Sequence, residues 1–137
     1  MSVGDCPFSS SGIMLLFFMA SIRSKDTHPE MVLWIELDHR HFRRYPDLPG
    51  SPDFGNKKRK IAIFVDGCFW HGCPSCYRPP ATRKKYWQAK LKRNRAHDLH
   101  VSFTLQTKGF NVVRFWEHEV LGDPKECARR LVMLVDR

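Results

Sequence analysis

The feature that most constrains this chain is the stretch at residues 61–76, which reads IAIFVDGCFWHGCPSC. Its first six residues are mostly apolar and partly β-branched, and they end in an aspartate, a pattern that predicts a buried central strand. Three cysteines, a histidine and two aromatic residues follow within nine positions. The sequence therefore predicts a chemically reactive loop placed directly at the end of a strand.

The cysteines indicate a metal site rather than a disulfide framework. The chain has five, an odd number of which three are packed together, and this favours metal binding in a reducing compartment. Cys68, Cys73 and Cys76 have the spacing C-x4-C-x2-C, which suits a tetrahedral Zn²⁺ ion. Ordinary buried thiols are the alternative interpretation.

A zinc ion needs a fourth ligand, and we predict His118. It directly follows a second predicted strand at 110–116, and a parallel neighbour of 61–66 would end beside the cysteine loop. Other histidines and Cys127 remain alternatives. Because four protein ligands leave no position for water, we expect the zinc to be structural and to stiffen the loop.

The remaining pattern predicts a small α/β domain. We expect a flexible N-terminus over 1–11 and a single domain over 12–137, which begins with a short helix at 12–20. Helical spacing predicts a second helix over 30–42, capped by Asp26 or Thr27 and followed by a turn-rich connection at 43–56. A long helix over 83–107, capped by Thr82 and ended by Gly109, and a closing helix from Pro124 complete the order.

Charge points to a polyanionic partner. The formal net charge is +9 and the isoelectric point is near 9.6, which makes nucleic acid the first candidate and a ribosomal or membrane-surface role the competitor. The one apolar run near the start, at 13–20, is far too short to cross a bilayer. We expect no membrane association and a cytoplasmic, nucleoid-associated location.

Two aspartates flank the predicted strand. Asp53 precedes it and Asp66 ends it, and two carboxylates so placed can converge on Mg²⁺. Each aspartate taken alone also fits an ordinary turn. His71, three residues past Cys68, fits a zinc ligand, a packed loop residue or a general base. These residues alone do not decide among the three roles.

Five segments in the same order, at 19–30, 47–54, 64–76, 80–94 and 109–120, resemble the very-short-patch mismatch repair endonucleases. The likeness covers about 12–122. These bacterial enzymes nick DNA beside a T·G mismatch left when 5-methylcytosine deaminates. The resemblance implies a restriction-endonuclease-like fold, a central mixed β-sheet flanked by helices, with a structural zinc site.

The resemblance also implies roles for individual residues. Asp53 falls on the Mg²⁺-binding carboxylate, and the backbone carbonyl of Val65 falls where the family supplies a second oxygen to that metal. His71 matches the catalytic histidine that activates water, and Glu30 matches an N-terminal acid that supports the site. Asp66 stands where some members carry a second active-site histidine, which leaves open whether it binds metal.

The zinc and DNA-binding positions carry over in the same way. Cys68, Cys73, Cys76 and His118 fall on the four zinc positions, although His118 replaces a more usual cysteine. The aromatic wedges that enter the base stack correspond to Phe69, Trp70 and Trp87. Packing of the first two against the loop is the alternative. Arg83 and Lys84 begin a strongly basic helical segment that can follow phosphates, or can simply be a solvated face.

These observations predict a Mg²⁺-dependent, zinc-stabilised endonuclease that nicks double-stranded DNA at T·G mismatches and leaves a 5′-phosphate. Inserting flat side chains costs unstacking, on the order of a few kcal/mol per step, and that cost is lower at a weakened pair. We expect a monomer that works with other mismatch repair proteins. A non-catalytic zinc module that binds DNA and a restriction-type nuclease acting on unmismatched duplex are the alternatives.

Overall fold

The computed structural model describes residues 26–69, 71–76 and 78–135 of the 137-residue chain. The flexible segment predicted over 1–11 and the helix predicted over 12–20 lie outside the described residues. So does Trp70, one of the three predicted aromatic wedges.

A four-stranded mixed sheet forms the centre of the fold. The elements in chain order are α2 (His28–Glu36), β1 (Arg43–Arg44), β2 (Phe54–Asn56), β3 (Ile61–Asp66), α3 (Lys84–Thr107), β4 (Asn111–Trp116), α4 (Glu117–Gly122) and α5 (Pro124–Val135). The strand order is β1-β2-β3-β4, in which the first two pairs are antiparallel and β3 and β4 are parallel. The predicted α/β fold with a mixed sheet flanked by helices is confirmed.

The parallel pair places two segments, distant in sequence, at one edge of the sheet. Ile61 pairs with Asn111 at the start and Asp66 pairs with Trp116 at the end. Both strands therefore stop at the same level, and the chain that leaves each of them enters the same region. The expectation that a parallel neighbour of 61–66 would end beside the cysteine loop is confirmed.

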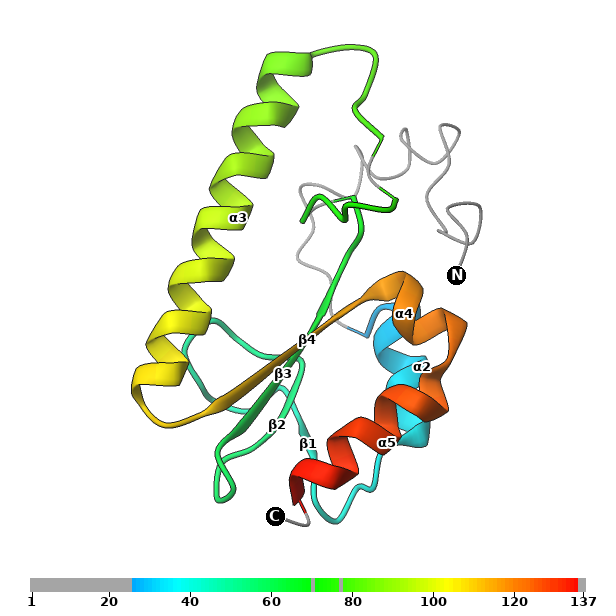
Figure 1. The fold of residues 1–137 in the computed structure, drawn as a ribbon, viewed down its shortest axis with the longest axis vertical. Helices are drawn as coiled ribbons and strands as arrows, with labels where there is room; N and C mark the ends of the chain where they lie inside the picture. The colour runs from blue at the N-terminus through cyan, green and yellow to red at the C-terminus, as the bar shows by residue number, and fades with distance from the viewer. Residues whose placement is uncertain (1–25, 70, 77, 136–137) are drawn as a thin grey trace.

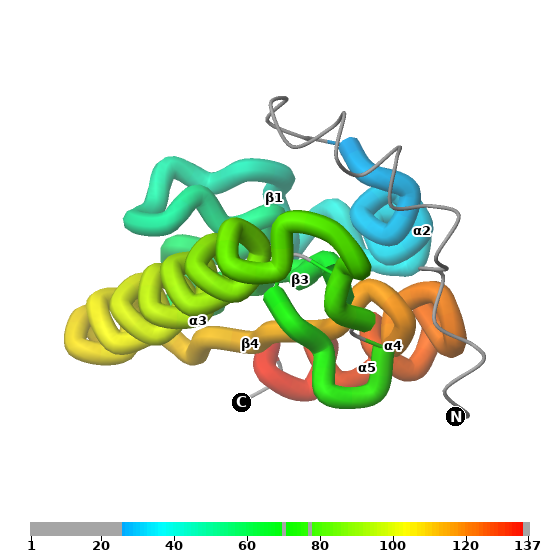
Figure 2. Tube along the Cα trace, turned by 90° about the horizontal axis from the view of Figure 1, so that it is seen from above, coloured from blue at the N-terminus to red at the C-terminus, as the bar shows by residue number. Residues whose placement is uncertain are grey.

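Helices cover both faces of the sheet. Figure 1 shows α3 on one side of the strands and α2, α4 and α5 on the other, and the view from above in Figure 2 agrees. Side-chain alternation along β3 explains this arrangement. Ile61 and Ile63 pack with the α2 and α5 side, whereas Ala62 and Phe64 pack with Val101 of α3. Asp66 lies two residues after Phe64, so its side chain points to the same face as Ala62 and Phe64.

Helix α2 begins as its sequence indicates but ends earlier. Thr27 is the N-cap, and its N–H donates a hydrogen bond to Oε2 of Glu30 at 2.6 Å. The prediction of a helix reaching residue 42 is wrong, because the helix ends at Glu36. The carboxylate of Asp38 accepts a hydrogen bond from the N–H of Arg40 at 2.9 Å, so the side chain competes with the helical pattern and forms a turn.

Helix α3 runs for 24 residues from Lys84 to Thr107. Thr82 is not its N-cap as predicted; that position is held by Arg83, whose φ is 55° and whose guanidinium lies 4.6 Å from the centroid of the Tyr86 ring. Gly109 follows the helix with φ of 87°, as expected for a C′ glycine. Much of the basic surface of the helix stays exposed, since it buries only Trp87, Val101 and Leu105.

Three short elements escaped prediction. Strands β1 and β2 lie within the segment predicted as a turn-rich connection, and α4 lies between β4 and the closing helix. Two- and three-residue strands carry too few side chains for a recognisable alternation. Within the described part of the chain, no helix has the length and apolar character needed to span a lipid bilayer.

Candidate functional site

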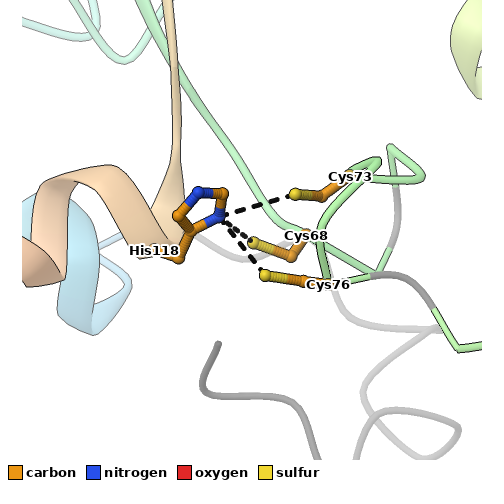
Figure 3. Close-up of side chains that lie close together, drawn as sticks. All are labelled: Cys68, Cys73, Cys76 and His118. Atoms are coloured by element: carbon orange, nitrogen blue, oxygen red, sulfur yellow. Dashed lines mark hydrogen bonds between the residues drawn. The ribbon is translucent and has the colours of Figure 1, made fainter. Parts of the chain in front are cut away.

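Three cysteines and a histidine meet at the ends of β3 and β4. Cys68, Cys73 and Cys76 lie on the loop that follows β3, and His118 lies in the first turn of α4. The Nδ1 atom of His118 is 3.4, 3.5 and 3.4 Å from the three sulfur atoms in that order, as the dashed lines in Figure 3 mark. The structure thus brings together all four residues predicted as zinc ligands.

The geometry of this cluster fits zinc. In a tetrahedral site with Zn–S bonds of about 2.3 Å and Zn–N bonds of about 2.0 Å, nitrogen and sulfur lie about 3.5 Å apart. Burial raises the pKa of the Cys68 thiol to about 12, because it disfavours the charged thiolate. A coordinated cation would reverse this effect by stabilising the deprotonated sulfur. Cys127 lies elsewhere, where its thiol is 3.7 Å from the carbonyl oxygen of Glu119.

The cysteine loop is also held by contacts to its neighbours. Gly72 has φ of 68°, and its carbonyl accepts a hydrogen bond from Nη2 of Arg95 on α3 at 2.9 Å. A Cβ atom at this glycine would lie 2.7 Å from Leu91. On the other side of the loop, the N–H of Cys68 donates to the carboxylate of Glu117 at 3.1 Å. The loop is therefore fixed between α3 and α4.

Glu30 and Asp53 form a pair of acids beside the sheet. Glu30 is 4% exposed although it is an acid, and Asp53 is partly buried. Burial, together with a hydrogen bond to Glu30 and the nearby charge of Glu30, raises the pKa of Asp53 to about 9. Glu30 therefore acts on Asp53, and its supporting role in the site stays a prediction.

The carboxylate of Asp53 is aimed at the end of β3. The N–H of Val65 donates to Oδ2 of Asp53 at 2.7 Å, and the N–H of Asp53 donates to the carbonyl of Ile63 at 2.9 Å. The acid is thereby fixed against the main chain at residue 65, where the second metal-binding oxygen is expected. The donor set fits a hard cation such as Mg²⁺. The role of the Val65 carbonyl itself stays a prediction.

His71 belongs to a different cluster from the cysteines. Its Nδ1 atom forms a short hydrogen bond with Oδ2 of Asp98 on α3, and ligand atoms of His71, Asp98 and Asp66 all lie within 4.8 Å of one another. Burial on its own would lower the pKa of His71, but the hydrogen bond to Asp98 and the charges of both aspartates outweigh it and raise the pKa. Of the three roles left open, this placement favours a proton-transferring imidazole.

Asp66 is paired with an arginine of β4. Nη1 of Arg114 donates to both carboxylate oxygens of Asp66, at 3.0 and 3.2 Å. Burial raises the pKa of Asp66, while the charges of His71 and Arg114 lower it. The two strands are in register with Phe64 opposite Arg114, so the arginine reaches the α3 face that carries Asp66.

Sequence reasoning missed Asp98 and Arg114. One signal for Asp98 was present, since it is the one acidic residue of the basic helix α3. A single acid among so many cations would be expected to have a specific partner. Arg114 gave a similar signal as a charge in the strand segment NVVRFW. Neither signal names the partner, because the partners come from other elements.

The predicted DNA-binding residues are in two different environments. Phe69 and Trp87 are each 5% exposed, and their rings make an edge-to-face contact with centroids 5.3 Å apart. Arg83 and Lys84 are exposed at the start of α3. In this conformation the two aromatic rings support the loop against the helix, and their insertion into DNA stays a prediction.

Together, these residues supply the groups needed for phosphodiester hydrolysis. The acid pair offers oxygen ligands for a cation, and the imidazole held by Asp98 leaves Nε2 available to take a proton from water. The cysteine cluster is closed, with four protein ligands, and fits a structural role. The site thus brings together groups that could carry out hydrolysis and a separate cluster that could hold a structural metal ion.

Comparison with known proteins agrees with this geometry. The sequence profile of the family described as DNA mismatch endonuclease Vsr matches residues 16–78, a range that contains the acid pair, His71 and the three clustered cysteines. The type II nicking enzyme V.NaeI of Lentzea aerocolonigenes is 39% identical over 113 residues, which cover 77% of this chain and 68% of the relative.

Two further relatives extend the comparison. The type II nicking enzyme V.NmeDIP of Neisseria meningitidis serogroup C is 37% identical over 119 residues, covering 82% of this chain and 80% of the relative. The DNA mismatch endonuclease Vsr of Escherichia coli strain K12 is 39% identical over 80 residues, covering 57% of this chain and 51% of the relative. Both similarities extend over more than half of the present chain.

Proposed function

The chain belongs to the Vsr family of DNA mismatch endonucleases and is a DNA endonuclease, and from that premise we propose that it nicks one strand of duplex DNA at T·G mismatches in a Mg²⁺-dependent reaction. The names of its nicking relatives support single-strand cleavage, and the mismatch activity named for the Escherichia coli relative supports the substrate. We also propose that one restriction-endonuclease-like domain over 12–137 carries the activity as a monomer.

One observation carries the proposal. His71 is held by Asp98, lies next to Asp66, and is separate from the cysteine cluster. Asp66 also contributes to the raised pKa of Asp53, which supports a site that includes both the imidazole and this acid. A zinc module that only binds DNA would need neither a buried acid pair nor a carboxylate-bound histidine.

In the proposed reaction, Asp53 and the Val65 carbonyl would hold Mg²⁺, with Glu30 supporting Asp53. The bound ion would supply positive charge for the scissile phosphate and for the departing oxygen. Nε2 of His71 takes a proton from the attacking water, and Asp98 stabilises the ring as it becomes charged. The water oxygen bonds to phosphorus while the bond to the 3′ oxygen breaks; the departing 3′ oxygen takes a proton from solvent, which leaves a 3′-hydroxyl and a 5′-phosphate.

The fold also supports separate roles in DNA binding for the basic face of α3 and for the aromatic residues. The exposed basic face of α3, beginning with Arg83 and Lys84, would follow the phosphate backbone. Phe69, Trp70 and Trp87 would supply the wedge at the mismatch, where a wobble pair is easier to deform than a matched pair. A zinc ion at the cysteine cluster would hold the loop that carries two of these rings.

The decisive experiment uses duplexes labelled separately on each strand, with either a T·G or a matched pair at one position. We expect incision of the T-containing strand only, dependent on Mg²⁺ and abolished by EDTA, with ends that ligase can rejoin. His71→Ala and Asp53→Asn should lose incision but still bind the duplex, and Trp70→Ala should lose preference for the mismatch. Equal cleavage of both strands, or of matched duplex, would instead identify a restriction-type nuclease.

A further inference from the structure

All three nitrogens of the Arg114 guanidinium donate hydrogen bonds to residues of β3 and α3. Besides its two bonds to Asp66, Nη2 donates to the carbonyl of Asp98 at 3.2 Å and Nε donates to Oγ of Ser102 at 3.0 Å. Its Cζ atom lies 4.1 Å from the centroid of the Phe64 ring. One side chain of β4 therefore ties the end of β3 to the middle of α3.

The same arginine stands where a cation would otherwise bind. Ligand atoms of Asp66, His71 and Asp98 lie within 4.8 Å of one another, a donor set that suits a divalent ion. Nη1 of Arg114 is 3.0 Å from one carboxylate and 3.8 Å from the other. The carboxylates are largely buried, so their charges need compensation, and the guanidinium provides it.

We propose that Arg114 acts as a built-in cation that takes the place of a second divalent metal ion between Asp66 and Asp98, and so confines metal binding to Asp53. Asp66 is then a positioning residue paired with Arg114, and not a metal ligand. This inference rests on the proposed function in placing the catalytic ion at Asp53. It goes further in assigning a purpose to the aspartate that replaces an active-site histidine of the family.

Local geometry explains why an arginine performs this task. The strand register places Arg114 opposite Phe64, and the ring supports the flat face of the guanidinium. A planar fork can bind a carboxylate with one edge and a carbonyl and a hydroxyl with its other donors, whereas an ammonium group offers a point charge. Arg114 therefore both neutralises Asp66 and orients the turn of helix that carries Asp98.

The inference is tested by counting Mn²⁺ ions on the full-length zinc-containing protein by electron paramagnetic resonance. Arg114→Gln should bind one more Mn²⁺ per chain than the unaltered protein, and the double variant Arg114→Gln/Asp66→Asn should lose that increment. Arg114→Lys keeps the charge and should bind no additional ion. Zinc content of one per chain and a cooperative melting transition serve as folding controls. An unchanged count in Arg114→Gln would overturn the proposal.

A second measurement avoids substitution of the arginine. Asp66→Asn should lower the rate of incision at saturating Mg²⁺ but leave the Mg²⁺ concentration at half-maximal rate within about twofold. If Asp66 ligates the metal, that concentration should rise about tenfold or more, which would also overturn the proposal. The proposed function would be contradicted if Mn²⁺ binding survived Asp53→Asn, or if the unaltered protein made no incision at all. In either case the additional Mn²⁺ ion expected in Arg114→Gln would still decide the role of Arg114.

Discussion

Asp98→Asn tests the role of the histidine most directly. The substitution keeps the size and one acceptor of the side chain but removes the charge that faces Nδ1 of His71. A hydrogen bond to a charged group contributes about 1.5–3 kcal/mol, and one pKa unit corresponds to about 1.4 kcal/mol. Because the charge of Asp66 remains, we expect the pKa of His71 to fall in the variant without losing all of its upward shift.

The sign of the effect on activity follows from the role of a general base. His71 must be neutral to accept a proton, and Asp98 holds its pKa above the ordinary value, so the acidic limb of the pH–rate profile lies above that of a free imidazole. Asp98→Asn should move this limb to lower pH. It should also lower the maximal rate by about tenfold to a hundredfold, because the ring loses its orientation.

The assay is single-turnover incision of a T·G duplex between pH 5 and pH 9 at saturating Mg²⁺, so that protonation of the metal-binding acid does not set the limb. Asp47→Asn provides a matched control, since Asp47 is exposed and the chemical change is identical. An acidic limb that stays in place or moves upwards in Asp98→Asn would refute the reasoning. Stability provides a second test. Because the pKa of His71 is raised, the His71–Asp98 pair stabilises the fold at low pH, and this contribution is lost as pH rises. Asp98→Asn should therefore lower the free energy of unfolding more at pH 6 than at pH 9.

Three further predictions concern the metals and the loop. His118→Ala should release zinc and lower the melting temperature, His118→Cys should retain one zinc per chain, and the matched control Cys127→Ser should do the same, as measured by atomic absorption and thermal melting. Burial and Glu30 raise the pKa of Asp53 to about 9, so the metal-free fold is relatively favoured at low pH and loses stability as pH rises towards 9. Asp53→Asn should therefore melt a few degrees above the unaltered metal-free protein at pH 8. Gly72→Ala forces a side chain into the left-handed region and against Arg95, where a Cβ would lie 2.6 Å from Nη2; it should destabilise the fold by about 1–3 kcal/mol in urea titrations.

The reliability of the sequence predictions follows the range of the interactions. The strand at 61–66, the cap at Thr27 and the glycine at 109 depend on patterns within a few residues, and the structure confirms all three. The ends of helices were harder to place. Helical spacing continued to Phe42, but a turn at Asp38 ends the regular pattern earlier, and Phe42 is buried in the core without being helical.

The candidate site shows the same division. The three cysteines could be assigned because they lie close together in sequence, and His118 could be added because parallel strands end at the same level. Asp98 contacts a histidine 27 residues away, and Arg114 contacts an aspartate 48 residues away. The first pair depends on how α3 lies across the sheet and the second on the register of β3 and β4, and no local pattern contains that information.

The register of β3 and β4 links the cysteine cluster to the charges around Asp66. Arg114 pairs with Phe64, two residues before Asp66, so the side chains of Arg114 and Asp66 both point to the face covered by α3. His118 reaches the cysteines because β4 ends level with β3. A slip of one residue would turn Arg114 to the opposite face and withdraw it from Asp66. Since a zinc ion joining Cys68 to His118 would couple the ends of the two strands, it would also hold this register. A structural zinc at the loop would therefore stabilise the pairing on which the active-site charges depend.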